Sequence, residues 1–194
     1  MDMPFDASHD IPSEALLAAF AAGDIAAARV LTLRLTPRIF GYAMRLLRDR
    51  AEAEDVTQEA LLRLWKIAPE WRMGEARVTT WLYRVTTNLC TDRLRRARWS
   101  GLDEIAEPAD DAPGAFERML DADRMDALDA ALALLPARQR QAVILRHLEH
   151  LSNPEIAEVM DIGIEAVESL TARGKRRLSA ALAGRRADLG YENG

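Results

Sequence analysis

An asparagine stands among arginines and threonines near the middle of the chain. Residues 72–98 hold seven arginines and two acids, a net charge of +5. Arginine neutralises phosphate, the Asn88 amide offers a paired donor and acceptor, and unpaired bases stack on rings such as those of Trp81 and Tyr83. These residue types indicate a surface for nucleic acid. The alternative is a solvated helix whose aromatic rings belong to the core.

Charge is segregated along the rest of the chain as well. Residues 99–130 hold ten acids and two arginines, a net charge of −8, and residues 173–186 hold six basic residues and no acid. The net charge of −5 over 194 residues hides this pattern. Two basic blocks separated by an acidic one produce local fields, so the overall negative charge does not exclude a nucleic-acid partner.

A cluster of acids and an amide lies just before the basic block, at Asp55, Gln58 and Glu59. Apolar residues in the same stretch return to one side at helical spacing, at Val56, Leu61 (or Ala60), Leu64 and Trp65, which predicts one amphipathic helix over residues 51–65. Such a polar cluster is commonly a solvated face. Its place immediately before the basic, asparagine-bearing segment favours a docking surface for a protein instead.

Helical spacing also predicts the elements around this helix. We expect one helix from Ser13, capped by Ser13 itself, a second capped by Asp24, and a third opened by Thr36-Pro37, because proline suits a first helical turn. Residues 69–75 break the chain before the next helix. Little β-branched alternation occurs, so this half is predicted to be all-α.

The basic block is predicted to form one helix over residues 78–99. Its core stripe is expected to consist of Trp81, Leu82, Val85 and Leu89. The polar residues on or near the opposite side are Arg84, Thr87, Asn88, Thr91 and Arg95.

The C-terminal half has the pattern of a helix-turn-helix. Ser152 and Glu155 form a capping-box sequence for a short helix over residues 153–160, and Asp161-Ile162-Gly163 makes a turn in which Ile162 is expected to be buried. The following helix ends in a run of basic residues. In such a motif the first helix braces the second, whose N-terminal residues enter the major groove of DNA. Helix pairs with short turns also occur in plain bundles.

Composition divides the chain into five segments. They are a flexible N-terminus (1–12), a helical domain (13–99), an acidic linker with prolines and glycines (100–117), a second helical domain (118–186) and a tail (187–194). The fold class predicted from sequence is therefore all-α, with two small helical domains joined by a flexible acidic linker.

Several other function classes find no support. A single cysteine, Cys90, excludes an internal disulfide framework, and with three scattered histidines it forms no metal-ligand pattern. No apolar run approaches the ~20 residues that cross a membrane, and no basic signal-peptide region opens the chain, so we expect a cytoplasmic protein. No nucleophile–base pair or phosphate-binding glycine loop suggests an enzyme.

Four stretches together resemble the small extracytoplasmic-function class of bacterial RNA polymerase sigma factors. They are AEDVTQEALLRLW at 53–65, TWLYRVTTNLCTDRLRR at 80–96, LPARQRQAVILR at 135–146 and LSNPEIAE at 151–158. The resemblance implies a four-helix-type region 2 domain and a helix-turn-helix region 4 domain. It also implies that the protein binds core polymerase and promoter DNA, under the control of an anti-sigma factor and for a stress-response regulon. It implies no cofactor, no metal, no small-molecule substrate and no catalytic residue.

The resemblance also assigns residues. The residues implied to bind core polymerase are Asp55, Gln58, Glu59, Leu62 and Trp65. Those implied to bind the melted minus-ten element are Trp81, Tyr83, Arg84, Asn88, Thr91, Arg95 and Arg96, with Asn88 at the position that contacts a flipped-out base. Those implied to read the duplex minus-thirty-five element are Glu165, Glu168, Ser169, Ala172, Arg173, Arg176 and Arg177.

Glu168 departs from the family, whose members often carry a basic residue there. A glutamate can accept from a cytosine amine or orient a neighbouring arginine, and both alternatives stay open. A different function, that of a sigma mimic that titrates an anti-sigma factor without binding DNA, is disfavoured because both basic blocks are retained.

Overall fold

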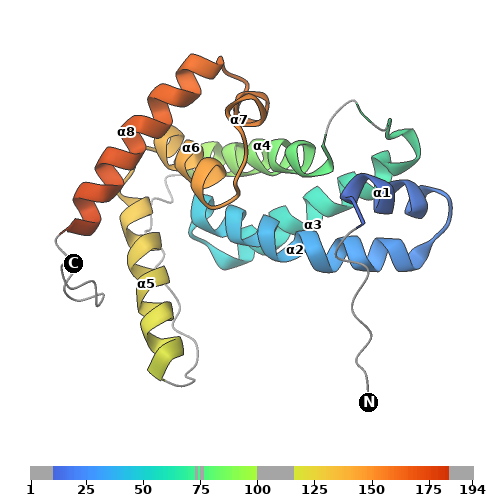
Figure 1. Cartoon of the computed structure of the whole chain (residues 1–194), viewed down its shortest axis with the longest axis horizontal. Coiled ribbons are helices and arrows are strands. Elements are labelled where there is room, and N and C mark those ends of the chain that lie inside the picture. The colour runs from blue at the N-terminus through green and yellow to red at the C-terminus, as the bar shows by residue number, and fades with distance from the viewer. Residues whose placement is uncertain (1–10, 73, 75–76, 100–115, 184–194) are drawn as a thin grey trace. The chain divides into compact units, whose positions relative to one another are not determined.

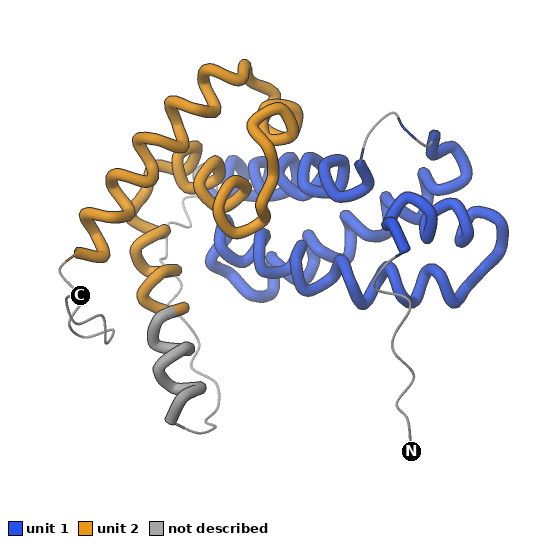
Figure 2. The backbone as a smooth tube through the Cα atoms, in the orientation of Figure 1, with its two compact units in different colours: residues 1–101 blue, residues 102–194 orange. Residues whose placement is uncertain are grey.

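The computed structural model describes residues 11–72, 74, 77–99 and 116–183. Within these residues it has eight α-helices, one 3-10 turn and no strand, so the all-α prediction is confirmed. The chain divides into two compact units, residues 1–101 and 102–194 (Figure 2). Residues 1–10 of the predicted flexible N-terminus, nearly all of the acidic linker and the predicted tail lie outside the described residues.

The first unit is built around one long helix. Its elements are α1 (Ser13–Ala21), α2 (Ile25–Leu47), α3 (Arg50–Ile67), the 3-10 turn η2 (Ala68–Glu70) and α4 (Val78–Trp99). Helix α2 packs against α1, α3 and α4 (Figure 1). Its buried face repeats at helical spacing along its whole length, at Ala27, Leu31, Leu35, Ile39, Tyr42, Ala43 and Leu46.

The prediction that a helix ends before Thr36-Pro37 is wrong, because α2 continues through Pro37. A proline inside a helix costs about 3 kcal/mol, since it removes one hydrogen bond and crowds the preceding turn. Leu31 and Leu35 before the proline and Ile39 after it are all buried on one face. Burial of a single such side chain contributes about 1.5–3 kcal/mol, so continuous packing outweighs the local cost.

Side chains stabilise the starts of three helices in this unit. Asp24 accepts from the backbone amides of Ala26 and Ala27, as predicted, and Asp49 accepts from the amide of Glu52 at the start of α3. The predicted cap at Ser13 is wrong, because Pro12 holds the capping position of α1 without a side-chain bond. The carboxylate of Glu14 in α1 instead accepts from the Val78 amide at 2.9 Å, so one helix caps the start of another.

The core face of α4 is rotated from the predicted stripe. Leu82 is buried as expected, but Trp81, Val85 and Leu89 are only half-buried. The buried residues are instead Val78, Thr80, Leu82, Tyr83, Thr86, Thr87 and Cys90. Thr87, expected on the polar side, is buried. Its hydroxyl and the Tyr42 hydroxyl share a 2.8 Å hydrogen bond, so neither buried group lacks a partner. Burial raises the pKa of Cys90 to about 12, so its thiol is not reactive in the folded chain.

The second unit contains the helix-turn-helix. Its elements are α5 (Phe116–Ala133), α6 (Ala137–His147), α7 (Asn153–Met160) and α8 (Ile164–Ala183). Ser152 and Glu155 form the predicted capping box, and Asp161 turns the chain in the left-handed region with φ of 52°. Ile162 is half-buried, less than expected. Helix α8 packs against α5, α6 and α7, which makes it the central helix of the unit.

Helices α6 and α8 pack closely at Gly174. A Cβ atom at this glycine would lie 2.5 Å from Cγ2 of Val143 and 3.1 Å from the carbonyl oxygen of Gln139. Both distances are shorter than ordinary van der Waals contact. The close crossing that holds α8 on its support therefore requires a glycine here.

Candidate functional site

One row of polar residues lies on the outside of α4. Arg84, Asn88, Thr91 and Arg95 are all exposed, and their spacings of four, three and four residues keep them on the same side of the helix. We call these four residues the α4 row. Arg96, also exposed, flanks it, and Arg95 forms a 3.0 Å ion pair with Asp92. The row places cationic and amide groups along about three turns, which suits a phosphate backbone and its bases.

The two predicted stacking rings of α4 differ in accessibility. Trp81 is half-buried and its ring packs edge-on against Trp71, with centroids 6.0 Å apart. Tyr83 is only 1% exposed and packs edge-on against Tyr42. Tyr83 is therefore a core residue, and the prediction that its ring stacks on a base is wrong for this conformation, because no face of the ring is accessible.

A second surface lies on the outside of α3. Asp55 and Gln58 are exposed, Glu59 is partly exposed, and Leu62 is 48% exposed although it is a large apolar residue. We call Asp55, Gln58, Glu59 and Leu62 the α3 face. Their spacing keeps them on one side of the helix, opposite the buried Val56, Ala60 and Leu64. An exposed leucine within acidic and amide groups suits contact with a protein rather than with DNA.

The resemblance grouped Trp65 with the residues of the α3 face, whereas its spacing placed it on the apolar side of the helix. In the structure Trp65 is half-buried and its ring packs edge-on against Phe20 of α1 at 5.0 Å. It holds α1 and α3 together beside the face. Glu59 forms a 2.8 Å ion pair with Arg63 one turn away on the same helix.

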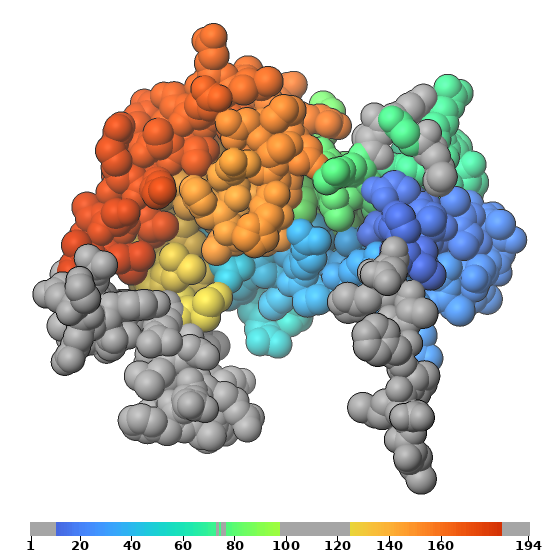
Figure 3. Space-filling view, viewed as in Figure 1, coloured from blue at the N-terminus to red at the C-terminus, as the bar shows by residue number. Residues whose placement is uncertain are grey.

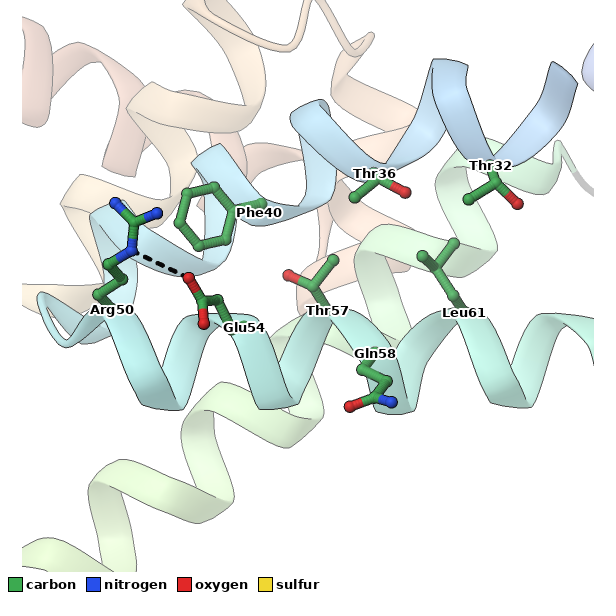
Figure 4. A pocket seen from close by; sticks show the side chains of 8 residues that line it. All are labelled: Thr32, Thr36, Phe40, Arg50, Glu54, Thr57, Gln58 and Leu61. Atoms are coloured by element: carbon green, nitrogen blue, oxygen red, sulfur yellow. Dashed lines mark hydrogen bonds and ion pairs between the residues drawn. The ribbon is translucent and has the colours of Figure 1, made fainter. Parts of the chain in front are cut away.

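Two different features border the α3 face. On one side, a pocket of about 490 Å³ opens between α2 and α3 (Figure 4). Thr32, Thr36 and Phe40 line it from α2, and an ion pair of 2.9 Å between Arg50 and Glu54 stands at one end. The α3 residues Thr57, Gln58 and Leu61 complete its lining, so Gln58 belongs to both the pocket and the face.

On the other side, Arg93 of α4 reaches across to α3. Its guanidinium pairs with the Glu52 carboxylate and lies 3.8 Å from Oδ2 of Asp55. The hydrogen bond that Arg93 donates to the Glu52 carboxylate is the main cause that raises the pKa of Arg93. From the sequence, Arg93 is one of the basic residues expected on the DNA-binding side, but in the structure it contacts α3. Its position three residues after the buried Cys90 continues the core face of α4, and this spacing is the signal for the contact.

A third surface lies on α8. All seven residues predicted to face duplex DNA are exposed, whereas Val167 and Gly174 on the other side are buried. This set, the α8 face, consists of Glu165, Glu168, Ser169, Ala172, Arg173, Arg176 and Arg177. Helix α8 runs from orange to red along the surface in Figure 3.

Glu168 makes a contact that neither earlier alternative anticipated. The side-chain amide of Asn153, at the start of α7, donates to its carboxylate at 3.3 Å. The acid therefore links the two helices of the motif. Nearby, Nε of Arg173 donates to the carbonyl oxygen of Ser169 at 3.2 Å, one turn earlier on α8.

A histidine lies at the end of α6, beside α8. The pKa of His147 is lowered, mainly by burial and further by the nearby charges of Lys175, Arg146 and His150. Across the described ranges, no three histidine, cysteine, aspartate or glutamate side chains are placed to hold a metal ion. None of the described helices is long and apolar enough to span a membrane.

Comparison with known proteins matches both units. Residues 31–100 match the family described as Sigma-70 region 2, and residues 125–178 match Sigma-70, region 4. The chain is 31% identical to the ECF RNA polymerase sigma factor SigM of Mycobacterium tuberculosis over 178 residues, covering 92% of this chain and 88% of the relative. It is 32% identical to the RNA polymerase sigma-H factor of Pseudomonas aeruginosa, covering 82% and 88%.

The fold also matches a solved structure. The sigma factor RpoE of Bartonella quintana, in complex with the anti-sigma factor NepR, superimposes with a TM-score of 0.65 at 24% identity. The match covers 78% of this chain and 94% of that one.

Proposed function

The chain belongs to the extracytoplasmic-function family of RNA polymerase sigma factors. We propose that the α3 face, the α4 row and the α8 face each carry out a different binding step. The protein binds core RNA polymerase and directs it to promoter DNA. It is not an enzyme, since the polymerase carries out the chemistry. The assignment of residues to these steps is the proposal.

The α3 face is the surface that binds core polymerase. The observation that carries this assignment is Leu62, a half-exposed leucine on an otherwise polar face. A partner that covers Leu62 gains apolar burial, while Asp55 and Glu59 attract cationic groups and repel other acidic surfaces. Trp65 contributes by holding α3 against α1 through Phe20.

The α4 row captures the melted strand of the minus-ten element. Asn88 stands in the middle of the row, and its amide has the donor and acceptor that a base edge requires. Arg84 and Arg95 lie on either side of it and neutralise phosphate, with Arg96 at the flank. Trp81 is half-buried and therefore still partly accessible for stacking, whereas the buried Tyr83 packs in the core and supports α4.

The α8 face reads the duplex minus-thirty-five element. Arg173, Arg176 and Arg177 supply phosphate contacts, and the smaller Ser169 and Ala172 allow close approach to base edges. The bond from Asn153 holds Glu168 toward α7. This contact favours a role for Glu168 in orienting the motif over direct recognition of a cytosine.

We further propose that an anti-sigma protein binds and inhibits this chain in the cytoplasm. We also propose that the genes transcribed with this chain belong to a stress response. The support is the Bartonella quintana structure, in which a sigma factor of this fold is held by an anti-sigma factor. A partner protein that co-purifies with this chain and inhibits its transcription would support this regulation, and transcription that no such partner reduces would count against it.

Charge reversal on the α3 face tests the polymerase assignment. Glu59→Arg places a cation where a cationic partner is expected, and like charges across an interface cost several kcal/mol, so affinity for core polymerase should fall by about tenfold or more. Asp55 is left intact because it also lies near Arg93. The matched control is Glu70→Arg, an exposed acid on the η2 turn outside the face. Undiminished binding by Glu59→Arg, or an equal loss with Glu70→Arg, would rule out this surface.

A further inference from the structure

Arg93 links α3 and α4, the two helices to which we assign polymerase binding and strand capture. Its guanidinium pairs with Glu52 and lies 3.8 Å from Asp55, both on α3, while Arg93 itself belongs to α4. Three other ion pairs of this unit, those of Arg50, Arg63 and Arg95, each join residues three or four apart on one helix. The Arg93 side chain is 28% exposed, the least among these four arginines.

The outer end of α4 is less buried than the first part of the helix. Among its described side chains Cys90 is the last buried one, and those from 91 to 97 are half-buried or exposed. Thr91, Arg95 and Arg96, all assigned to DNA, lie in this segment. Because this segment has less buried packing than the first part of α4, its direction relative to α3 depends more on polar links, of which the Arg93–Glu52 pair is one.

Arg93 also lies on the appropriate side of the helix for such a link. It follows Leu82, Thr86 and Cys90 at spacings of four, four and three residues, so it continues the buried face beyond the end of the core. The α4 row lies on the opposite side. A cation in this position therefore acts on α3 and does not compete with Arg84 or Arg95 for phosphate.

We propose that Arg93 is a positioning residue that couples polymerase docking to promoter opening, by fixing the DNA-binding end of α4 on α3 through Glu52 and Asp55. This inference rests on the proposed function of the α3 face and the α4 row. Asp55 contributes to both steps, since it lies on the α3 face and within reach of Arg93. The planar guanidinium can engage two carboxylates at once, which a lysine ammonium does less well.

Substitution of both partners separates positioning from other roles. Core polymerase is reconstituted with the full chain carrying Arg93→Gln, Glu52→Gln, or both, on a promoter selected with the wild-type holoenzyme. Affinity for core is measured by anisotropy, and the opening rate by 2-aminopurine fluorescence at saturating holoenzyme. Each single variant should slow opening by about fivefold, which corresponds to about 1 kcal/mol, with core affinity within about twofold of wild type.

The double variant supplies the decisive comparison. If the two residues act as a pair, Glu52→Gln combined with Arg93→Gln opens no more slowly than either alone, because the same link is lost. The exchanged pair Glu52→Arg with Arg93→Glu should recover part of the rate, and this recovery would not follow from a general loss of stability. Arg50→Gln, which breaks an ion pair confined to α3, is the matched control and should open at the wild-type rate.

Three results would overturn the proposal. One is a wild-type opening rate in Arg93→Gln. Another is an additive loss in the double variant. The third is a salt slope of promoter binding that falls by about one in Arg93→Gln, which would identify Arg93 as a direct phosphate contact. Failure of the α3 face itself is recognised separately, because Glu59→Arg would then bind core polymerase normally.

Discussion

Replacement of Gly174 by alanine tests the packing that positions the α8 face. The added Cβ would lie 2.5 Å from Cγ2 of Val143, about 1 Å or more inside the 3.5–4.0 Å separation at which carbon atoms attract. Val143 cannot easily turn away, since a β-branched side chain has one preferred rotamer in a helix. The carbonyl oxygen of Gln139, at 3.1 Å, belongs to the backbone and cannot move independently. Helices α6 and α8 must therefore separate.

The magnitude follows from two opposing effects. Overpacking of a close core contact costs about 1–3 kcal/mol. Alanine in place of glycine inside a helix adds about 1 kcal/mol of stability. The expected net loss is therefore up to about 2 kcal/mol of unfolding free energy, and each kcal/mol lost lowers the melting temperature of a unit of this size by about 4–8 °C. The loss concerns the second unit alone.

The assay must separate the two units. All four tryptophans, at positions 65, 71, 81 and 99, lie in the first unit, so their fluorescence does not report on this change. Hydrogen exchange of peptides from α6 and α8, together with circular dichroism on heating, measures the second unit in the whole chain. Exchange should accelerate there and remain unchanged in α2 and α3.

Gly41→Ala provides the matched control. A Cβ at Gly41 would meet only the end of the flexible Arg45 side chain at 3.3 Å, so this change should be neutral or stabilising by up to about 1 kcal/mol. Val143→Ala combined with Gly174→Ala should be less damaging than the sum of the two single changes, because the first removes the atom that the second meets. A higher melting temperature in Gly174→Ala would refute the close crossing.

Two further predictions concern single contacts. Glu14→Ala removes the hydrogen bond to the Val78 amide and should lower the unfolding free energy by about 1 kcal/mol, measured by urea unfolding with tryptophan fluorescence. Glu14→Gln retains an acceptor and should lose less stability. Equal losses in the two variants would argue against the cap. The lowered pKa of His147 means that the unfolded chain binds this proton more readily than the folded one. The second unit should therefore lose stability as the pH falls below about 6.5, and His147→Gln should reduce that loss when melting temperatures at pH 7 and pH 5 are compared; an unchanged pH slope would contradict it.

Features with a local cause were predictable from the sequence. The capping box at Ser152 and Glu155, the cap at Asp24 and the turn at Asp161 were all predicted, because each depends on groups close in sequence. The residues on the exposed side of α8 were implied by the family resemblance, and all seven are exposed.

Features that depend on contacts between distant segments were not predictable from spacing alone. Pro37 was read as a helix start, but burial on both sides of it keeps α2 continuous. Tyr83 was read as a stacking ring, but the face of α4 that meets α2 is decided by how Tyr42 and Thr87 pack. The cap from Glu14 to Val78 joins residues 64 positions apart, and no local signal predicts it.

We propose that docking and strand capture use separate surfaces of one helical unit, and paired measurements on two variants test this separation most directly. Asn88→Ala should bind core polymerase as the wild type does and open the promoter about tenfold more slowly, because one base contact is worth about 1–3 kcal/mol. Glu59→Arg should lose core affinity yet open normally once enough protein is added to saturate the enzyme. If each variant instead reduces core affinity and the saturated opening rate to the same extent, the two surfaces are not separate and the account is wrong.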